Sequence, residues 1–180
     1  MNKLSYKTLR KFLFATAMLA GLYAPLSAQI SIPKAKFHFD FPNKSWEYLE
    51  TLEIDKNTNM YVYSGAPLVS AKNDTTLPFL RIYVKNNIGD ENSLDYSLRR
   101  FMQQPFIIVD EFSESPYLPC KDAIGYIGIY KDNYGNRCEF YMLYFVHKNT
   151  LVEFRLETTE ESFEDKRAEF EEIMESITLD

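Results

Sequence analysis

The C-terminal third of the chain contains three successive segments that are typical of β-strands. We expect these strands over residues 123–130, 137–147 and 150–157, joined by a turn that contains Gly135 and by a second turn at 148–149. The middle segment is apolar on both of the alternating faces that a strand presents. An antiparallel sheet with one solvent-exposed face would alternate cleanly between apolar and polar residues. This sheet should therefore be covered on both sides.

The expected register of the two hairpins divides these side chains into two sets. We place Tyr130 opposite Arg137 and His147 opposite Thr150. One face then carries Ile124, Tyr126, Tyr141, Leu143, Phe145, Val152, Phe154 and Leu156. The other face carries Ile127, Ile129, Cys138, Phe140, Met142, Tyr144 and Val146. Both sets are apolar, so each needs a covering layer.

Two segments have the apolar stripe of an amphipathic helix. The first spans 94–104 and stops before Pro105, since a proline disfavours helical backbone in the residue before it. Its stripe consists of Leu94, Leu98, Phe101 and Met102. The second helix spans 162–176, with Ser162 suited to cap its start. The two helices provide material for covering layers.

Further strands are expected at 36–41, 60–63, 79–84 and 106–109, whereas the segment 46–53 fits neither pattern clearly. Together these elements predict the α+β class, with an antiparallel or mixed sheet covered by helices on both faces as an α/β/α sandwich. A sandwich with another topology is the alternative.

The first 29 residues have the layout of a secretory signal peptide. Four basic residues come first, an apolar run follows over 12–23, and small residues around Pro25 lead to Gln29. The apolar run is too short for a stable membrane span. We therefore expect a cleaved signal peptide over 1–29 and a single domain over 30–180, exported to the periplasm or the cell exterior. The ending Ser27-Ala28-Gln29 resembles signal peptides of Bacteroidetes.

Removal of that segment changes the charge of the chain. The whole sequence has 20 basic and 26 acidic residues, and loss of the four basic ones leaves a net charge of about −10. No basic stripe is present. An acidic domain of this kind repels nucleic acid, so we exclude nucleic acid as a partner.

Two stretches of the domain resemble a known family. The early Phe-x-Phe strand is followed by Pro42 and Trp46, and the last helix ends in a Phe-Glu-Glu-Ile-Met-Glu-Ser-Ile string over 170–177. This arrangement is similar to the PsbP-like superfamily, including DcrB-related exported bacterial domains, over residues 31–180. The resemblance implies an α/β/α sandwich and a non-enzymatic accessory or binding protein of the cell envelope. The chain lacks the lipoprotein cysteine of many bacterial relatives, so their membrane tether is not carried over.

Cys120 and Cys138 are the only cysteines. Export permits a disulfide between them, and an even count fits one. The expected hairpin places Cys138 opposite Ile129, nine residues from Cys120, which is about 30 Å along an extended strand. A bridge needs Cα atoms within about 7 Å of each other. The disulfide therefore requires the loop before the strand to fold back, and two separate thiols are the alternative.

No catalytic motif, cofactor fingerprint or metal-ligand spacing is present, so we expect no catalytic residue, cofactor or metal. An envelope protein or a small ligand is the expected partner, and a surface for it would use the aromatic residues Trp46, Tyr117 and Tyr134. One alternative is a small envelope hydrolase, in which Asp110, Glu111 and Glu114 would supply acid and base. Another is a subunit of a surface assembly held by edge-strand addition.

Overall fold

The structure is a computed structural model that describes residues 29–69, 75–112 and 118–180. Residues 1–28 of the predicted signal peptide, together with Glu114 and Tyr117, lie outside the described residues. Within the described ranges, no helix has the length and apolar character needed to cross a membrane.

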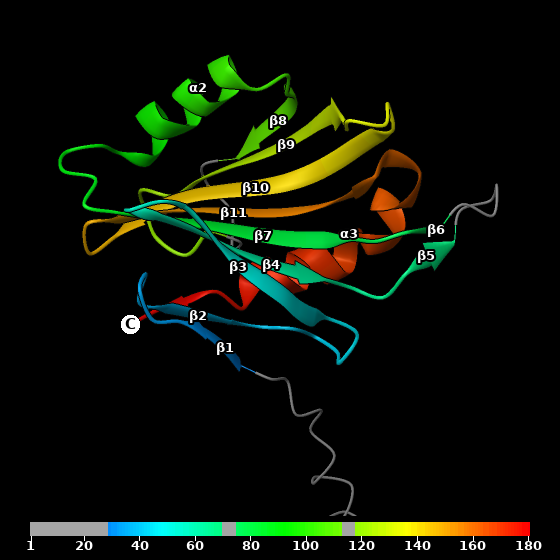
Figure 1. The fold of residues 1–180 in the computed structure, drawn as a ribbon, viewed down its shortest axis with the longest axis horizontal. Coiled ribbons are helices and arrows are strands. Elements are labelled where there is room, and N and C mark those ends of the chain that lie inside the picture. The colour runs from blue at the N-terminus through cyan, green and yellow to red at the C-terminus, as the bar shows by residue number, and fades with distance from the viewer. Residues whose placement is uncertain (1–28, 70–74, 113–117) are drawn as a thin grey trace, which may run out of the picture.

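A seven-stranded sheet lies at the centre of the molecule, and every pair of neighbouring strands is antiparallel (Figure 1). In spatial order its strands are β3 (Glu47–Asp55), β4 (Thr58–Ser64), β7 (Phe79–Asn86), β11 (Thr150–Thr159), β10 (Arg137–His147), β9 (Ile124–Lys131) and β8 (Ile107–Phe112). The segment whose pattern was ambiguous is β3, and it forms one edge of this sheet. The other edge is β8.

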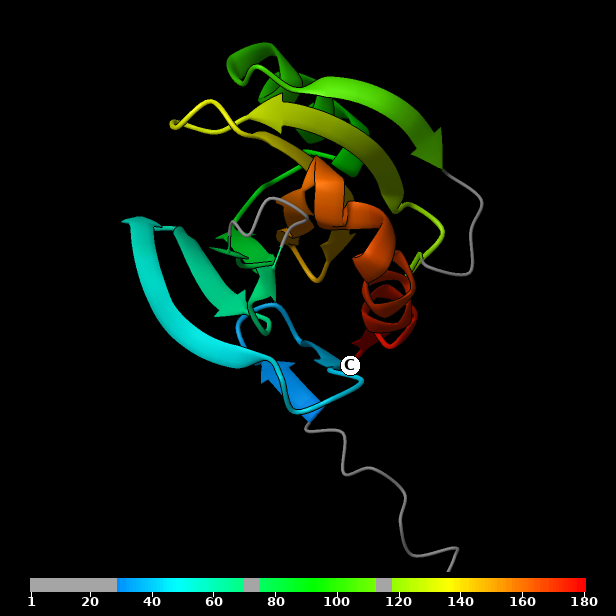
Figure 2. The ribbon, with the colours of Figure 1, turned by 90° about the vertical axis from the view of Figure 1, so that its right-hand side faces the viewer.

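The remaining elements pack on or beside this sheet. They are a three-stranded sheet of β1 (Gln29–Ile32), β2 (Phe37–Asp40) and β12 (Thr178–Leu179), a two-stranded ladder of β5 (Leu68–Val69) and β6 (Thr75–Thr76), and the helices α2 (Ser93–Gln103) and α3 (Glu160–Glu175). In Figure 2 the large sheet curves around α3 and the β1–β2 strands. Strand β1 begins at Gln29, the last residue of the predicted signal peptide.

Each face of the large sheet has its own apolar core. The first core lies between the sheet, α3 and the three-stranded sheet, and it includes the fully buried rings of Phe37, Phe39 and Phe154. The second lies between the sheet and α2, around Phe140 and Tyr144. The expectation that both faces are covered is therefore confirmed.

The prediction of an α/β/α sandwich, however, is wrong. Strands account for 51% and helices for 19% of the described residues, and these include only two helices. The cause lies in the Phe-alternating segment at the start of the domain. It pairs with β1 and β12 instead of joining the large sheet, so a second sheet supplies cover that a helical layer would otherwise provide.

One hairpin register is as expected and the other is shifted by one residue. His147 pairs with Thr150, as predicted, but Cys138 rather than Arg137 pairs with Tyr130. A shift of one residue moves every side chain of a strand to the other face. Ile124 and Tyr126 consequently belong to the α2 core, whereas Ile127 packs against the α3 core.

Helix α2 also turns a different face to the sheet than its apolar stripe indicates. Leu94, Leu98 and Met102 are exposed, with Met102 at 83%. The helix instead buries Tyr96 and Ser97. Polar contacts set this orientation, because the Ser97 hydroxyl lies 2.9 Å from the Tyr126 hydroxyl and Arg100 forms an ion pair with Glu153 on β11.

Candidate functional site

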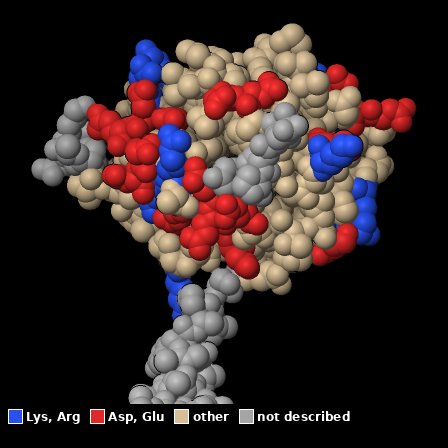
Figure 3. Space-filling view, turned by 180° about the vertical axis from the view of Figure 1, so that it is seen from behind, with Lys and Arg blue, Asp and Glu red and all other residues tan. Residues whose placement is uncertain are grey.

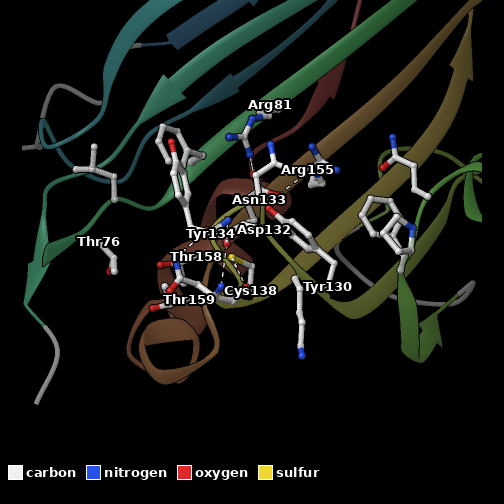
Figure 4. Close-up of a pocket in the computed structure, with 18 of the residues that line it drawn as sticks. Thr76, Arg81, Tyr130, Asp132, Asn133, Tyr134, Cys138, Arg155, Thr158 and Thr159 are labelled. Atoms are coloured by element: carbon white, nitrogen blue, oxygen red, sulfur yellow. Dashed lines mark hydrogen bonds and ion pairs between the residues drawn. The ribbon is translucent and has the colours of Figure 1, made fainter. Parts of the chain in front are cut away.

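A pocket opens on the α2 side of the large sheet, beyond the C-terminal end of α2. Its volume is about 680 Å³, within the range of small-molecule sites. The floor comes from β7, β10 and β11, and the walls come from the residues after α2 and from the β9–β10 turn. We call it the arginine pocket, after Arg81 and Arg155, which Figure 4 shows on neighbouring strands beside Tyr130.

The two arginines occupy directly opposed positions of the β7–β11 ladder. Both form ion pairs with Glu157, and for Arg155 the Nε–Oε2 distance is 3.2 Å. The Tyr130 hydroxyl donates a hydrogen bond of 3.0 Å to the same carboxylate. Among the described residues, this carboxylate is the only one within ion-pair distance of either guanidinium. The floor therefore holds two positive charges and one negative charge.

Aromatic rings hold both guanidinium groups in place. The Cζ atom of Arg81 lies 4.7 Å from the centroid of the Phe79 ring, and Cζ of Arg155 lies 5.6 Å from that of Phe106. Cation–π contacts of this kind favour the charged guanidinium. Nevertheless, burial lowers the pKa of Arg81, and the neighbouring charge of Arg155 lowers it further. The floor is thus a place where the protein itself leaves positive charge incompletely compensated.

The other end of the same β11 face shows a complete charge pair. Glu153 is fully buried and accepts hydrogen bonds from Arg100 Nε at 2.9 Å and Arg100 Nη2 at 3.3 Å. Burial opposes the charge of Arg100, yet the attraction of Glu153 raises its pKa above the ordinary value. One carboxylate thus meets one guanidinium where α2 covers the sheet.

The β9–β10 turn forms the rim of the arginine pocket. The carboxylate of Asp132 accepts hydrogen bonds from the backbone N–H groups of Tyr134 and Asn136, at 2.9 and 2.8 Å. These contacts close the turn between Asp132 and Asn136, which explains the shifted register of this hairpin. The Asn136 side chain and the backbone N–H groups of the turn lower the pKa of Asp132. Its charge is therefore engaged within the turn.

Of the predicted partner residues, the structure describes Trp46 and Tyr134, and these two do not form one surface. Tyr134 is 92% exposed and lies on the rim of the pocket. Trp46 is 7% exposed; its ring stacks on Phe41, and its Nε1 donates a hydrogen bond of 2.6 Å to Glu169 of α3. Trp46 therefore belongs to the core rather than to an exposed surface.

The structure does not bring the two cysteines together either. Both are free thiols. Cys138 lines the arginine pocket, whereas Cys120 packs against the core on the α3 side. Burial raises the pKa of each thiol.

Of the three acidic residues proposed for a hydrolase, the structure describes Asp110 and Glu111, and these two do not converge. Asp110 and Glu111 are exposed on the edge strand β8, and as consecutive residues of a strand they point to opposite faces. Within the ranges that the structure describes, no group of three or more His, Cys, Asp or Glu side chains could hold a metal ion. The two histidines, His38 and His147, both contact Asp180.

Sequence reasoning missed Arg81, Arg155 and Glu157, although one signal for them was present. Strand 150–157 was expected to be covered on both sides, yet Glu153, Arg155 and Glu157 alternate along one of those faces. Charged residues on a covered face must find partners there. That row pointed to a buried charge cluster on this face.

Known structures provide a comparison for the fold. The cyanobacterial PsbP protein CyanoP of Synechocystis sp. PCC 6803 superimposes with a TM-score of 0.57 and 12% identity, covering 89% of this chain and 96% of that one. LpqN of Mycobacterium tuberculosis, described as involved in cell envelope biogenesis, superimposes with a TM-score of 0.54 and 13% identity, covering 85% of this chain and 90% of LpqN. PA94 of Pseudomonas aeruginosa, described as a protein of unknown function and putative regulator, superimposes with a TM-score of 0.52 and 12% identity, covering 83% of this chain and 94% of PA94.

At these identities the similarity concerns the fold. No protein-family model matches the sequence, and no curated protein matches it significantly. The similar structures nevertheless include a PsbP protein, and the superpositions cover nearly the whole length of CyanoP and of LpqN. The resemblance noted in the sequence is therefore confirmed, and this chain has the fold of the PsbP-like superfamily.

Proposed function

We propose that this protein is an exported accessory protein of the bacterial cell envelope that acts by binding a small ligand in the arginine pocket. The observation that carries the proposal is the pocket floor, where two guanidinium groups share one buried carboxylate beneath an open volume of about 680 Å³. The fold shared with LpqN, described as involved in cell envelope biogenesis, supports the envelope assignment. The predicted signal peptide supports export.

The chemistry of the pocket favours binding over catalysis. A general base needs a carboxylate that is free to accept a proton at the reacting atom. Glu157 is engaged by Arg81, Arg155 and Tyr130, and Asp132 is engaged by its own turn. Neither carboxylate of the pocket lining is therefore available for proton transfer.

Native mass spectrometry on the protein recovered gently from its own cell envelope tests this proposal. We expect a discrete small mass in addition to that of the chain, and we expect this mass to be lost on denaturation. The mass of the denatured chain also tests export, because removal of the predicted signal peptide shortens it by a known amount. A bare chain in every preparation would contradict the ligand-binding proposal.

A second candidate function, a subunit of a surface assembly, rests on the edge strand β3. All nine residues of β3 are exposed. They include four acidic residues and four apolar ones but no basic residue: Glu47, Tyr48, Leu49, Glu50, Leu52, Glu53, Ile54 and Asp55. An exposed strand edge can pair with an extended segment of another chain. The charge of β3 favours a partner strand that carries basic side chains.

Substitution of one edge residue tests this second function. A lysine on an edge strand opposes strand addition, so Leu52→Lys should abolish recovery of the native complex with another polypeptide. Met102→Lys is the matched control, because Met102 is an exposed apolar residue on α2. Equal recovery of a complex with both variants would exclude β3 as the contact.

A further inference from the structure

The pocket floor contains an arrangement that proteins ordinarily avoid. Arg81 and Arg155 are cross-strand partners, and like charges directly opposite each other on a sheet are destabilising. The Arg155 side chain is only 9% exposed, so water screens little of this repulsion. An arrangement of this kind calls for negative charge close to both guanidinium groups.

The described residues supply only part of that charge. The lining of the pocket includes three basic residues, Arg81, Lys131 and Arg155, and two acidic residues, Asp132 and Glu157. Asp132 is engaged by its turn, which leaves Glu157 for the two arginines. In addition, Arg155 Nε is buried; it lies 3.2 Å from Glu157 Oε2 but is not aligned for a hydrogen bond, and it makes none to any described residue. A buried donor in that state remains available to another acceptor.

The N–H donors of Arg81 and Arg155 are suited to binding a ligand. Arg81 lies over the Phe79 ring and Arg155 over the Phe106 ring, and the N–H donors of each guanidinium lie in its own plane. Arginine in such a setting binds carboxylate and phosphate groups through paired hydrogen bonds. The same rings and Leu77 offer apolar wall next to the donors.

We propose, building on the ligand-binding function above, that Arg81 and Arg155 bind the oxyanion of an anionic ligand, a carboxylate or phosphate group attached to an apolar or aromatic body. The oxyanion accepts hydrogen bonds from both guanidinium groups and compensates the charge that Glu157 leaves over. The body of the ligand lies against Phe79 and Phe106. A ligand of metabolite size fits the volume of about 680 Å³.

The outer surface of the domain makes this site distinctive. Acidic side chains gather on the face shown in Figure 3. Helix α3 contributes several exposed acidic residues, namely Glu161, Glu164, Asp165, Glu172 and Glu175. That face repels anions. An anionic ligand is therefore directed to the arginine pocket by the contrast between the two regions.

Isothermal titration of the purified protein with three probes tests the proposal. Phenyl phosphate and benzoate carry an oxyanion on an aromatic ring, and benzyl alcohol is a neutral counterpart. At constant ionic strength we expect both anions to bind at least about tenfold more tightly than the alcohol. The better of the two anions identifies the phosphate or the carboxylate as the natural group. Equal binding of all three probes would overturn the proposal.

Substitutions assign the effect to the pocket. Arg155→Gln should weaken anion binding about tenfold or more, because it removes one charged donor pair. Arg167→Gln is the control, since Arg167 lies on α3 and forms an ion pair with Glu164 there.

A third variant should change anion affinity in the opposite direction. Glu157→Gln removes the internal competitor for both guanidinium groups, so anion affinity should rise, and added phenyl phosphate should raise the unfolding temperature more than in the unsubstituted protein.

These outcomes distinguish failure of the anion proposal, which the first two results below would show, from failure of the proposed ligand-binding function, which the third would show. If Glu157→Gln leaves anion affinity unchanged or lowers it, the arginines serve only to hold the sheet together and the anion proposal is wrong. If benzyl alcohol binds as well as benzoate, and the native protein carries a ligand, the pocket binds ligands but not through charge. If no probe binds and the native protein is bare, the proposed function fails as well.

Discussion

Loss of the Glu157 charge is the perturbation whose effect on stability follows most directly from the pocket floor. Glu157 is 2% exposed, and its carboxylate contacts two guanidinium groups and the Tyr130 hydroxyl. Glu157→Gln preserves the size of the side chain and leaves an acceptor for Tyr130. It removes the only negative charge that the described residues place between Arg81 and Arg155.

The expected cost follows from the burial of the charges that remain. Removal of one partner from a buried ion pair costs about 3–5 kcal/mol, because the other charge stays buried without compensation. The Arg81 side chain is 25% exposed, so solvent offsets part of the loss, and we expect about 3 kcal/mol. For a domain of this length, each kcal/mol lowers the unfolding temperature by about 2–4 °C. The variant should thus unfold about 6–12 °C below the unsubstituted protein.

Urea unfolding measures this difference, with Glu160→Gln as the control. Glu160 also forms an ion pair, with Arg137, but the two side chains are 42% and 53% exposed. An exposed pair contributes about 0–1 kcal/mol. If both variants lose the same small amount, the guanidinium groups on the pocket floor are well hydrated. The premise of uncompensated charge, and with it the argument for an anionic ligand, would then be refuted.

Three further predictions concern packing, ionisation and thiols. Gly125→Ala should cost about 1–3 kcal/mol in urea unfolding, because a Cβ there would overlap the Phe112 ring; an unchanged midpoint would contradict the packing of β8. Burial raises the pKa of Tyr63 to about 12. Since this folded value exceeds the unfolded value of about 10, stability should be unaffected below pH 10 and fall as the pH rises toward 12, as measured by unfolding at each pH. Without reductant, the denatured protein should yield two reactive thiols, and in the native protein half-buried Cys120 should react before buried Cys138; failure of both to react would indicate a disulfide.

The part of the fold that was predictable is the part with local determinants. The β10–β11 hairpin was placed correctly because its turn residues, Lys148 and Asn149, adopt the positive φ angles that tight two-residue hairpins require. The β9–β10 register depended instead on which residues of a longer turn are paired. In that turn the hydrogen bonds of the Asp132 carboxylate fix the register. The alternation of apolar and polar residues along the strands gives no information about these hydrogen bonds.

Other errors arose where tertiary contacts outweigh the local pattern. The apolar stripe of α2 predicts that Leu98 is buried, but the ion pair between Arg100 and Glu153 rotates the helix toward its polar side. The cap of α3 was expected at Ser162, whereas the helix begins after Thr159. The second sheet was missed because β2 and β12 lie at opposite ends of the domain in sequence, and their pairing leaves no short-range signal.

The arginine pocket was missed for a related reason, and its origin explains its charge. Arg81 and Arg155 come from strands far apart in the sequence that are neighbours only in the folded sheet. Where α2 covers this face, its own Arg100 neutralises Glu153 one to one. Helix α2 ends at Gln103, before Pro105, so no helical residue reaches the stretch of the same face around Glu157. The position at which the helix ends therefore creates both the open volume and the surplus positive charge, and these two properties of the pocket share one structural cause.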